Sequence, residues 1–152
     1  GKNGSQYMHN HSVGIEVNNF GYLTKGGYKK KVNGKRVWIE KDPSKYYTYA
    51  GATAHESQIV ECSFKGYDTW HKYSDAQIES LRLLILHIAD RDGIDVRLGL
   101  PTLIKTMGAK AFEWNEDAYY GRVKGLWTHT NTKKGKFDMF PQQELLDMLT
   151  SL

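Results

Sequence analysis

The sequence contains a single cysteine, Cys62, among 152 residues, and it therefore cannot form an internal disulfide bond. It has no apolar run near the roughly 20 residues that a membrane-spanning helix needs. It also has no internal repeat, no low-complexity segment and no linker. These absences exclude a disulfide-stapled domain and a repeat array. No secretory signal pattern is present, which leaves the location open. Cys62 itself lies in a strand-like run, 60–64, and is interpreted as a small buried hydrophobic side chain.

The composition is that of one globular domain. Hydrophobic residues make up 39% and charged residues 25% of the chain, enough for one core within residues 1–152. The net charge is +4 and the isoelectric point about 9.0, a mild bias. The lysines cluster in 25–45, where they fit a solvated hairpin edge or attraction to an acidic polymer such as a cell wall or nucleic acid.

Residue patterns predict strands in the first half of the chain and helices in the second. The strands are expected at 13–17, in a hairpin within 22–49 that turns at Asn33-Gly34, and at 58–64. A capping box at 74–77 predicts a helix that ends at Gly93. Pro101 opens a second helix or loop, 111–124 is irregular, and a short helix follows Pro141. The fold class is therefore α/β.

The stretch 125–142 places His129, Lys136 and Asp138 on one polar loop. Histidine and a carboxylate can supply two ligands to one zinc ion, and catalytic zinc sites usually have three protein ligands and a water. In an extended stretch, positions 136 and 138 point to the same side. Lys136 would then lie beside the metal, where a cation can stabilise the oxyanion of a tetrahedral intermediate. The same spacing also fits an ordinary polar loop.

Glu16 lies in the middle of the expected strand 13–17, and it faces the side opposite to Ile15 and Val17. A glutamate near a zinc-bound water is the usual general base of zinc hydrolases, because it takes the proton as the water attacks a carbonyl. The alternative is an exposed glutamate on a solvated sheet face.

Three ordered motifs resemble those of the zinc-dependent N-acetylmuramoyl-L-alanine amidases of type 2, which are related to phage T7-type lysozyme and peptidoglycan recognition proteins. They are Ser12–Asn18 (SVGIEVN), Tyr73–Leu81 (YSDAQIESL), and the closing His129, Lys136 and Asp138. Three further segments resemble a subgroup of this family found in bacteriophages and Bacteroidetes-like bacteria. They are Phe20–Lys25, Phe64–Tyr67 and Pro141–Leu145.

The resemblance implies a fold and a reaction. The fold would be a mixed central β-sheet flanked by helices, with zinc at the end of the sheet. His129 and Asp138 would be zinc ligands, Glu16 the base that activates the zinc-bound water, and Lys136 the oxyanion-stabilising cation. The bond cut would be the amide between N-acetylmuramic acid and the L-alanine of the stem peptide. The enzyme would act in the cell wall, either secreted or delivered by a phage.

The family has a further zinc-binding histidine on an early strand, before the motif that contains Glu16, and nothing here matches it. We therefore expect the C-terminal portion of an amidase domain. Three explanations remain open. An N-terminal segment or second chain could complete the site, the chain could be truncated, or it could be a remodelled relative that no longer hydrolyses a substrate. His9 or His11 could replace the third ligand. Three other histidines match no ligand position: His55, His71 and His87. His87, within the apolar helix, is expected to be packed or interfacial.

Two hypotheses follow from these residues. The first is a zinc-dependent peptidoglycan amidase of a phage or bacterial lytic system. The second is a non-catalytic peptidoglycan-binding or structural module on the same fold, which the unmatched first ligand favours. If strands of the central sheet are missing, an unpaired edge and apolar surface would be exposed. A nucleic-acid role fits the charge but no motif.

Overall fold

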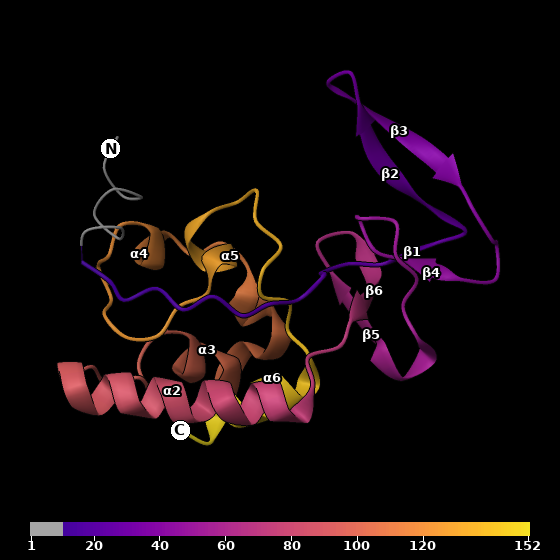
Figure 1. The fold of residues 1–152 in the computed structure, drawn as a ribbon. Helices are drawn as coiled ribbons and strands as arrows, with labels where there is room; N and C mark the ends of the chain where they lie inside the picture. The colour runs from indigo at the N-terminus through magenta and orange to yellow at the C-terminus, as the bar shows by residue number, and fades with distance from the viewer. Residues whose placement is uncertain (1–10) are drawn as a thin grey trace. The chain divides into compact units, whose positions relative to one another are not determined.

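The structure is a computed structural model that describes residues 11–152. The chain divides into two compact units: one is Asn18–Ser74, and the other is Asp75–Leu152 together with the segment that ends at Val17. Strands occupy the first unit and helices the second (Figure 1). The α/β composition is confirmed, and the single domain expected for residues 1–152 stays a prediction.

The strands of unit Asn18–Ser74 form three antiparallel pairs. β1 (Thr24–Lys25) pairs with β4 (Tyr46–Tyr47), β2 (Gly27–Val32) with β3 (Lys35–Glu40), and β5 (Ile59–Phe64) with β6 (Tyr67–His71). A 3₁₀ turn, η1 (Glu56–Gln58), precedes β5. Asn33 and Gly34 both have positive φ, 48° and 80°, as the hairpin turn requires. The predicted hairpin and the strand at 58–64 are confirmed.

Trp70 is the centre of this unit's core. Its side chain is fully buried, and its indole N–H donates to the Cys62 carbonyl at 2.8 Å. The other buried apolar side chains of the unit are Leu23, Tyr47, Phe64 and Tyr73. Cys62 itself is half-buried on β5, and burial raises the pKa of its thiol. The raised pKa disfavours the thiolate and makes Cys62 weakly nucleophilic, but the side chain is not the fully buried one that the sequence indicates.

The prediction of a strand at 13–17 is wrong for the described residues, because residues 11–20 belong to no β-ladder. The side chains still alternate: Glu16 is exposed, whereas Ile15 and Val17 are half-buried. A strand needs a partner for its backbone N–H and C=O groups, and none lies beside this segment within residues 11–152. The described part of the chain contains three two-stranded sheets and no mixed central sheet.

The helical unit contains α2 (Asp75–Asp92), α3 (Leu100–Met107), η2 (Gly108–Phe112), α4 (Glu116–Tyr119), α5 (His129–Thr132) and α6 (Gln143–Thr150). The predicted boundaries of α2 hold, since it begins directly after Ser74 and stops before Gly93, whose φ is 65°. α6 packs against both α2 and α3. The buried apolar side chains of this unit include Ile85, Ile88, Leu100, Ile104, Phe112, Phe140, Leu145 and Leu149.

α2 is apolar on more than one face. Ile78, Leu81, Ile85 and Ile88 are buried, whereas Leu83, Leu84 and Leu86 are 55%, 42% and 38% exposed. His87 is also exposed, so the expectation that it is packed within the described residues is wrong. Within residues 11–152, no helix combines the length and the apolar character that crossing a bilayer requires.

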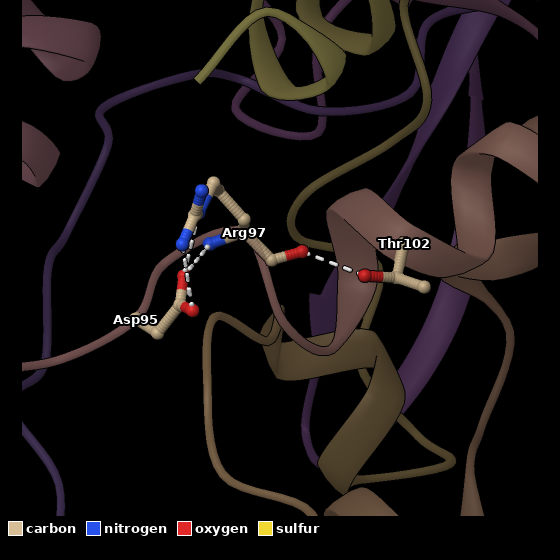
Figure 2. A network of polar contacts seen from close by, with 3 residues as sticks. All are labelled: Asp95, Arg97 and Thr102. Carbon is tan, nitrogen blue, oxygen red and sulfur yellow. Dashed lines mark hydrogen bonds and ion pairs between the residues drawn. The ribbon is translucent and has the colours of Figure 1, made fainter.

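A short polar network shapes the turn between α2 and α3 (Figure 2). The Asp95 carboxylate accepts from the Arg97 backbone N–H at 3.1 Å and from its guanidinium at 3.0 and 3.1 Å. The Arg97 carbonyl accepts from the Thr102 hydroxyl in the first turn of α3 at 2.7 Å. Arg97 also lowers the pKa of Asp95. The network is exposed and contributes little free energy.

Candidate functional site

His129 lies on α5, a single helical turn that is bound firmly to η2. The Thr130 hydroxyl donates to the Phe112 carbonyl at 2.6 Å. The Asn131 side-chain amide donates to the carbonyls of Ala111 and Glu113, both at 2.7 Å. Thr130 and Asn131 are both fully buried. Because the two residues that follow His129 are held in this way, its imidazole is presented outward from a rigid base.

The start of α5 is fixed by a second set of bonds. The Thr128 backbone N–H and hydroxyl both donate to the Asn131 side-chain oxygen, at 3.0 and 2.8 Å. The Asn131 backbone N–H donates in turn to the Thr128 carbonyl at 3.1 Å, so bonds in both directions close the first turn, as in a capping box. Asn131 therefore bonds both its own helix start and η2 with one side chain. A turn this short would be marginal by itself, and these bonds stabilise it.

The segment that leads into α5 is positioned by a backbone bridge. Leu126 donates to the Leu98 carbonyl at 3.0 Å and accepts from the Leu100 N–H at 2.8 Å. Gly99 lies between these two contacts with φ of 80°. A β-carbon at Gly99 would lie 2.6 Å from the Leu126 carbonyl oxygen and 3.0 Å from the Trp127 ring. Only glycine permits this close approach, so Gly99 sets the path of 126–128.

The structure brings His129 and Asp138 together, as the sequence predicts. Nδ1 of His129 lies 3.1 Å from Oδ2 of Asp138, and the two side chains are 43% and 61% exposed. Zinc bonds of about 2.0–2.2 Å at a tetrahedral angle place two ligand atoms about 3.3 Å apart. The observed separation therefore fits two ligands of one zinc ion. It also fits a hydrogen bond that orients the ring and leaves Nε2 facing outward.

Lys136 lies on the turn between these two residues. Its backbone N–H donates to the Lys133 carbonyl at 3.2 Å, and its side chain is half-buried. The Lys134 ammonium lies 4.5 Å from the centre of the Trp114 ring. This cation–π contact connects the turn to the segment between η2 and α4. The loop that contains Lys136 and Asp138 is thus attached at its start to α5 and to Trp114, and Asp138 contacts the His129 ring directly.

Glu16 is not brought into this group by the described structure. It is exposed, and it makes no hydrogen bond or ion pair among residues 11–152. The expected base therefore lies in the same compact unit as the metal-ligand pair, but no hydrogen bond or ion pair joins them among residues 11–152.

A third metal ligand is not found among the residues that the structure describes, where no three His, Cys, Asp or Glu side chains cluster. His9 lies outside the described residues, and His11 is exposed. His55 caps η1, because its Nδ1 accepts from the Ser57 N–H at 3.2 Å. His71 is half-buried on β6. The pair His129–Asp138 fits part of a zinc site, and the described residues do not complete it.

Sequence reasoning missed the residues that position His129. Thr128, Thr130 and Asn131 surround it in the run WTHTNT, and a Thr followed three residues later by Asn could have indicated a helix cap. Gly99 and Trp114 carry no such signal, because their roles depend on segments distant in the sequence.

Comparison of the chain with protein-family models, with curated proteins and with solved structures finds no match.

Proposed function

We propose that this chain is part of a zinc-dependent peptidoglycan amidase, which cuts the amide between N-acetylmuramic acid and the L-alanine of the stem peptide. The observation that carries the proposal is the 3.1 Å approach of His129 Nδ1 to Asp138 Oδ2 on a rigid base. Both side chains are partly exposed, so a bulky wall substrate can reach them. The motifs around Glu16 and at the start of α2 support the same family.

The proposed roles follow from the chemistry of each side chain. His129 and Asp138 would hold a zinc ion, which would lower the pKa of a bound water and polarise the lactyl carbonyl. Glu16 would accept the proton of the attacking water and deliver it to the alanine nitrogen as the carbon–nitrogen bond breaks. The Lys136 ammonium would stabilise the negative charge that develops on the carbonyl oxygen.

The proposal also includes a completing segment and a larger sheet. The third ligand would come from an N-terminal segment or a second chain, and residues 13–17 would pair with one of its strands in a mixed central sheet. Three observations support this part. Side chains alternate through 15–17 without a partner strand, Val13 is 46% exposed, and α2 leaves Leu83 and Leu84 on its surface. Such an enzyme would act in the cell wall.

The experiment measures zinc binding and bond cleavage on the same samples. Zinc affinity is determined for the chain and for His129→Ala and Asp138→Ala, with His87→Ala as the control for an exposed histidine outside the site. We expect each site variant to weaken zinc binding at least about tenfold, with His87→Ala unchanged. Equal zinc affinity in all four proteins would refute the metal site.

Cleavage is measured as the appearance of free alanine amino groups from purified peptidoglycan. Zinc-dependent release that a chelator stops and that Asp138→Ala abolishes supports the amidase.

A second candidate is a non-catalytic peptidoglycan-binding module. It is favoured because the described residues bring together two candidate zinc ligands and no third one. It is also favoured because Glu16 is exposed and makes no hydrogen bond or ion pair among those residues. Co-sedimentation with peptidoglycan, without release of amino groups at saturating zinc by a version of the chain extended upstream to include the completing segment, would establish this function in place of the amidase.

A further inference from the structure

The hairpin of β2 and β3 carries positive charge on both faces, and the cross-strand register defines what each face presents. Lys29 lies opposite Trp38, and Lys31 lies opposite Arg36. Since side chains alternate along a strand, these four share one face, which we call the cationic face. Lys30 and Lys35 lie on the other face, opposite Val37 and Val32. All these side chains are exposed.

The cationic face is not neutralised by the part of the chain that the structure describes. None of Lys29, Lys31 and Arg36 forms an ion pair among residues 11–152. The one acid of the hairpin, Glu40, lies on the same face beside Trp38 and accepts from the Trp38 indole N–H at 3.0 Å. With three cations and this one acid, the face keeps a net charge of +2. Lys31 and Arg36 are directly opposed like charges, an arrangement that destabilises a strand pair.

Protection of a strand edge does not require this arrangement. A single lysine at the edge prevents unwanted pairing, whereas opposed cations add repulsion without adding protection. The hairpin nevertheless folds with a type I′ geometry at Asn33 and Gly34. Figure 1 shows β2 and β3 as a long two-stranded ribbon whose turn lies at the end opposite to β1 and β4, so a long ligand can lie along it.

The spacing of the cations fits a regularly charged polymer. Alternate residues on one strand are about 6.8 Å apart, and neighbouring strands are about 4.8 Å apart. Lys29 and Lys31 thus form one row, and Arg36 begins a second beside it. A 1,3-linked poly(glycerol phosphate) chain has six backbone bonds between successive phosphorus atoms, and its extended repeat is therefore of similar length. Trp38, 40% exposed, offers an apolar surface to the carbons between the phosphates.

We propose that the cationic face binds a linear polyol-phosphate polymer, of the kind found in bacterial walls. Single-stranded nucleic acids have the same charge spacing, but proteins that bind them usually stack successive bases on several aromatic rings. This face presents one aromatic ring, and its indole N–H is already bonded to Glu40. The proposal concerns unit Asn18–Ser74 and does not depend on the proposed amidase activity.

The test compares two double variants of the full chain that lose the same charge from opposite faces. Lys31→Thr/Arg36→Thr alters the cationic face, and Lys30→Thr/Lys35→Thr is the matched control on the other face. Binding to immobilised poly(glycerol phosphate) is measured at several salt concentrations. Circular dichroism and thermal melting establish that each variant is folded. Lys29→Thr serves as an independent single variant.

We expect the Lys31/Arg36 variant to lose at least about tenfold in affinity and the salt dependence to fall by about 1–2 in log–log slope. Lys29→Thr should lose several-fold, and the Lys30/Lys35 control should stay within about threefold. Equal losses in the two double variants would mean general charge attraction and overturn the proposal. Tighter binding to an oligodeoxynucleotide with the same number of phosphates would overturn the choice of polymer.

Discussion

The side-chain amide nitrogen of Asn131 donates to the carbonyl oxygen of Ala111 at 2.7 Å, and this bond joins α5 to η2. The same nitrogen reaches the Glu113 carbonyl, and the amide oxygen accepts from Thr128. One buried side chain therefore connects the start of α5, the end of η2 and the segment after it. His129 precedes Thr130, the second anchor of this turn. These buried bonds therefore hold the backbone of the candidate site in place.

Asn131→Ala should lower the free energy of unfolding by about 2–4 kcal/mol, because it leaves the buried Ala111 carbonyl and the part-buried Glu113 carbonyl without their donor. Urea unfolding followed by tryptophan fluorescence measures the change. Thr132→Ala is the control, since its hydroxyl bonds only within α5, to the His129 carbonyl, and it should change stability by less than about 0.5 kcal/mol. Similar losses in the two variants would show that the side-chain bonds of Asn131 to Ala111 and Glu113 do not stabilise the fold.

The comparison of sequence and structure shows where local patterns were sufficient. The Asn33-Gly34 turn and the boundaries of α2 depend on residues adjacent in sequence, and both are confirmed. The strand expected at 13–17 depends on a partner strand, which its own residues cannot supply, and it is not formed. His129 and Asp138 could be paired because nine positions on one loop separate them. Gly99 and Trp114 could not be assigned, because each acts through a distant segment.

Lys136→Gln should separate catalysis from metal binding if the proposed amidase is correct. The substitution removes the cation that would stabilise the oxyanion, so we expect kcat to fall by about 10²–10³-fold. Zinc affinity should stay within about threefold, because Lys136 is not a ligand. Lys133→Gln, an exposed neighbour on the same turn, is the matched control and should retain activity. A parallel fall of zinc affinity and activity in Lys136→Gln would assign Lys136 a structural role instead.

Gly99→Ala should be much more destabilising than Gly93→Ala, although both glycines have positive φ. A β-carbon at Gly93 meets no atom within 4 Å, whereas one at Gly99 meets the Leu126 carbonyl at 2.6 Å. We expect losses of about 1 kcal/mol at Gly93 and about 3 kcal/mol at Gly99. Chemical denaturation of the two variants measures the difference. Equal losses would mean that the backbone around Gly99 and Leu126 can shift to accommodate a β-carbon without a loss of folding free energy.

His71 should make folding sensitive to mild acid. Its Nδ1 is buried and has no hydrogen-bond partner among the described residues, and burial lowers the pKa of the imidazole below its ordinary value. The unfolded chain therefore binds a proton more readily than the folded chain. As the pH falls below about 6.5 and through the folded pKa, the free energy of unfolding should decrease. Unfolding in urea at pH 7.5, 6.0 and 5.0 measures this decrease.

The decisive comparison for His71 is the same substitution at an exposed histidine. His71→Gln should flatten the dependence of stability on pH between 7.5 and 5.0, because the titrating group is gone. His87→Gln, at an exposed position, is the control for the same substitution with the buried ring of His71 left in place. Carboxylates with lowered pKa, such as Asp95 beside Arg97, lose their contribution only at pH values below about 4, since that is where they become protonated. They therefore do not obscure the histidine range. An unchanged slope in His71→Gln would assign the acid sensitivity to another group.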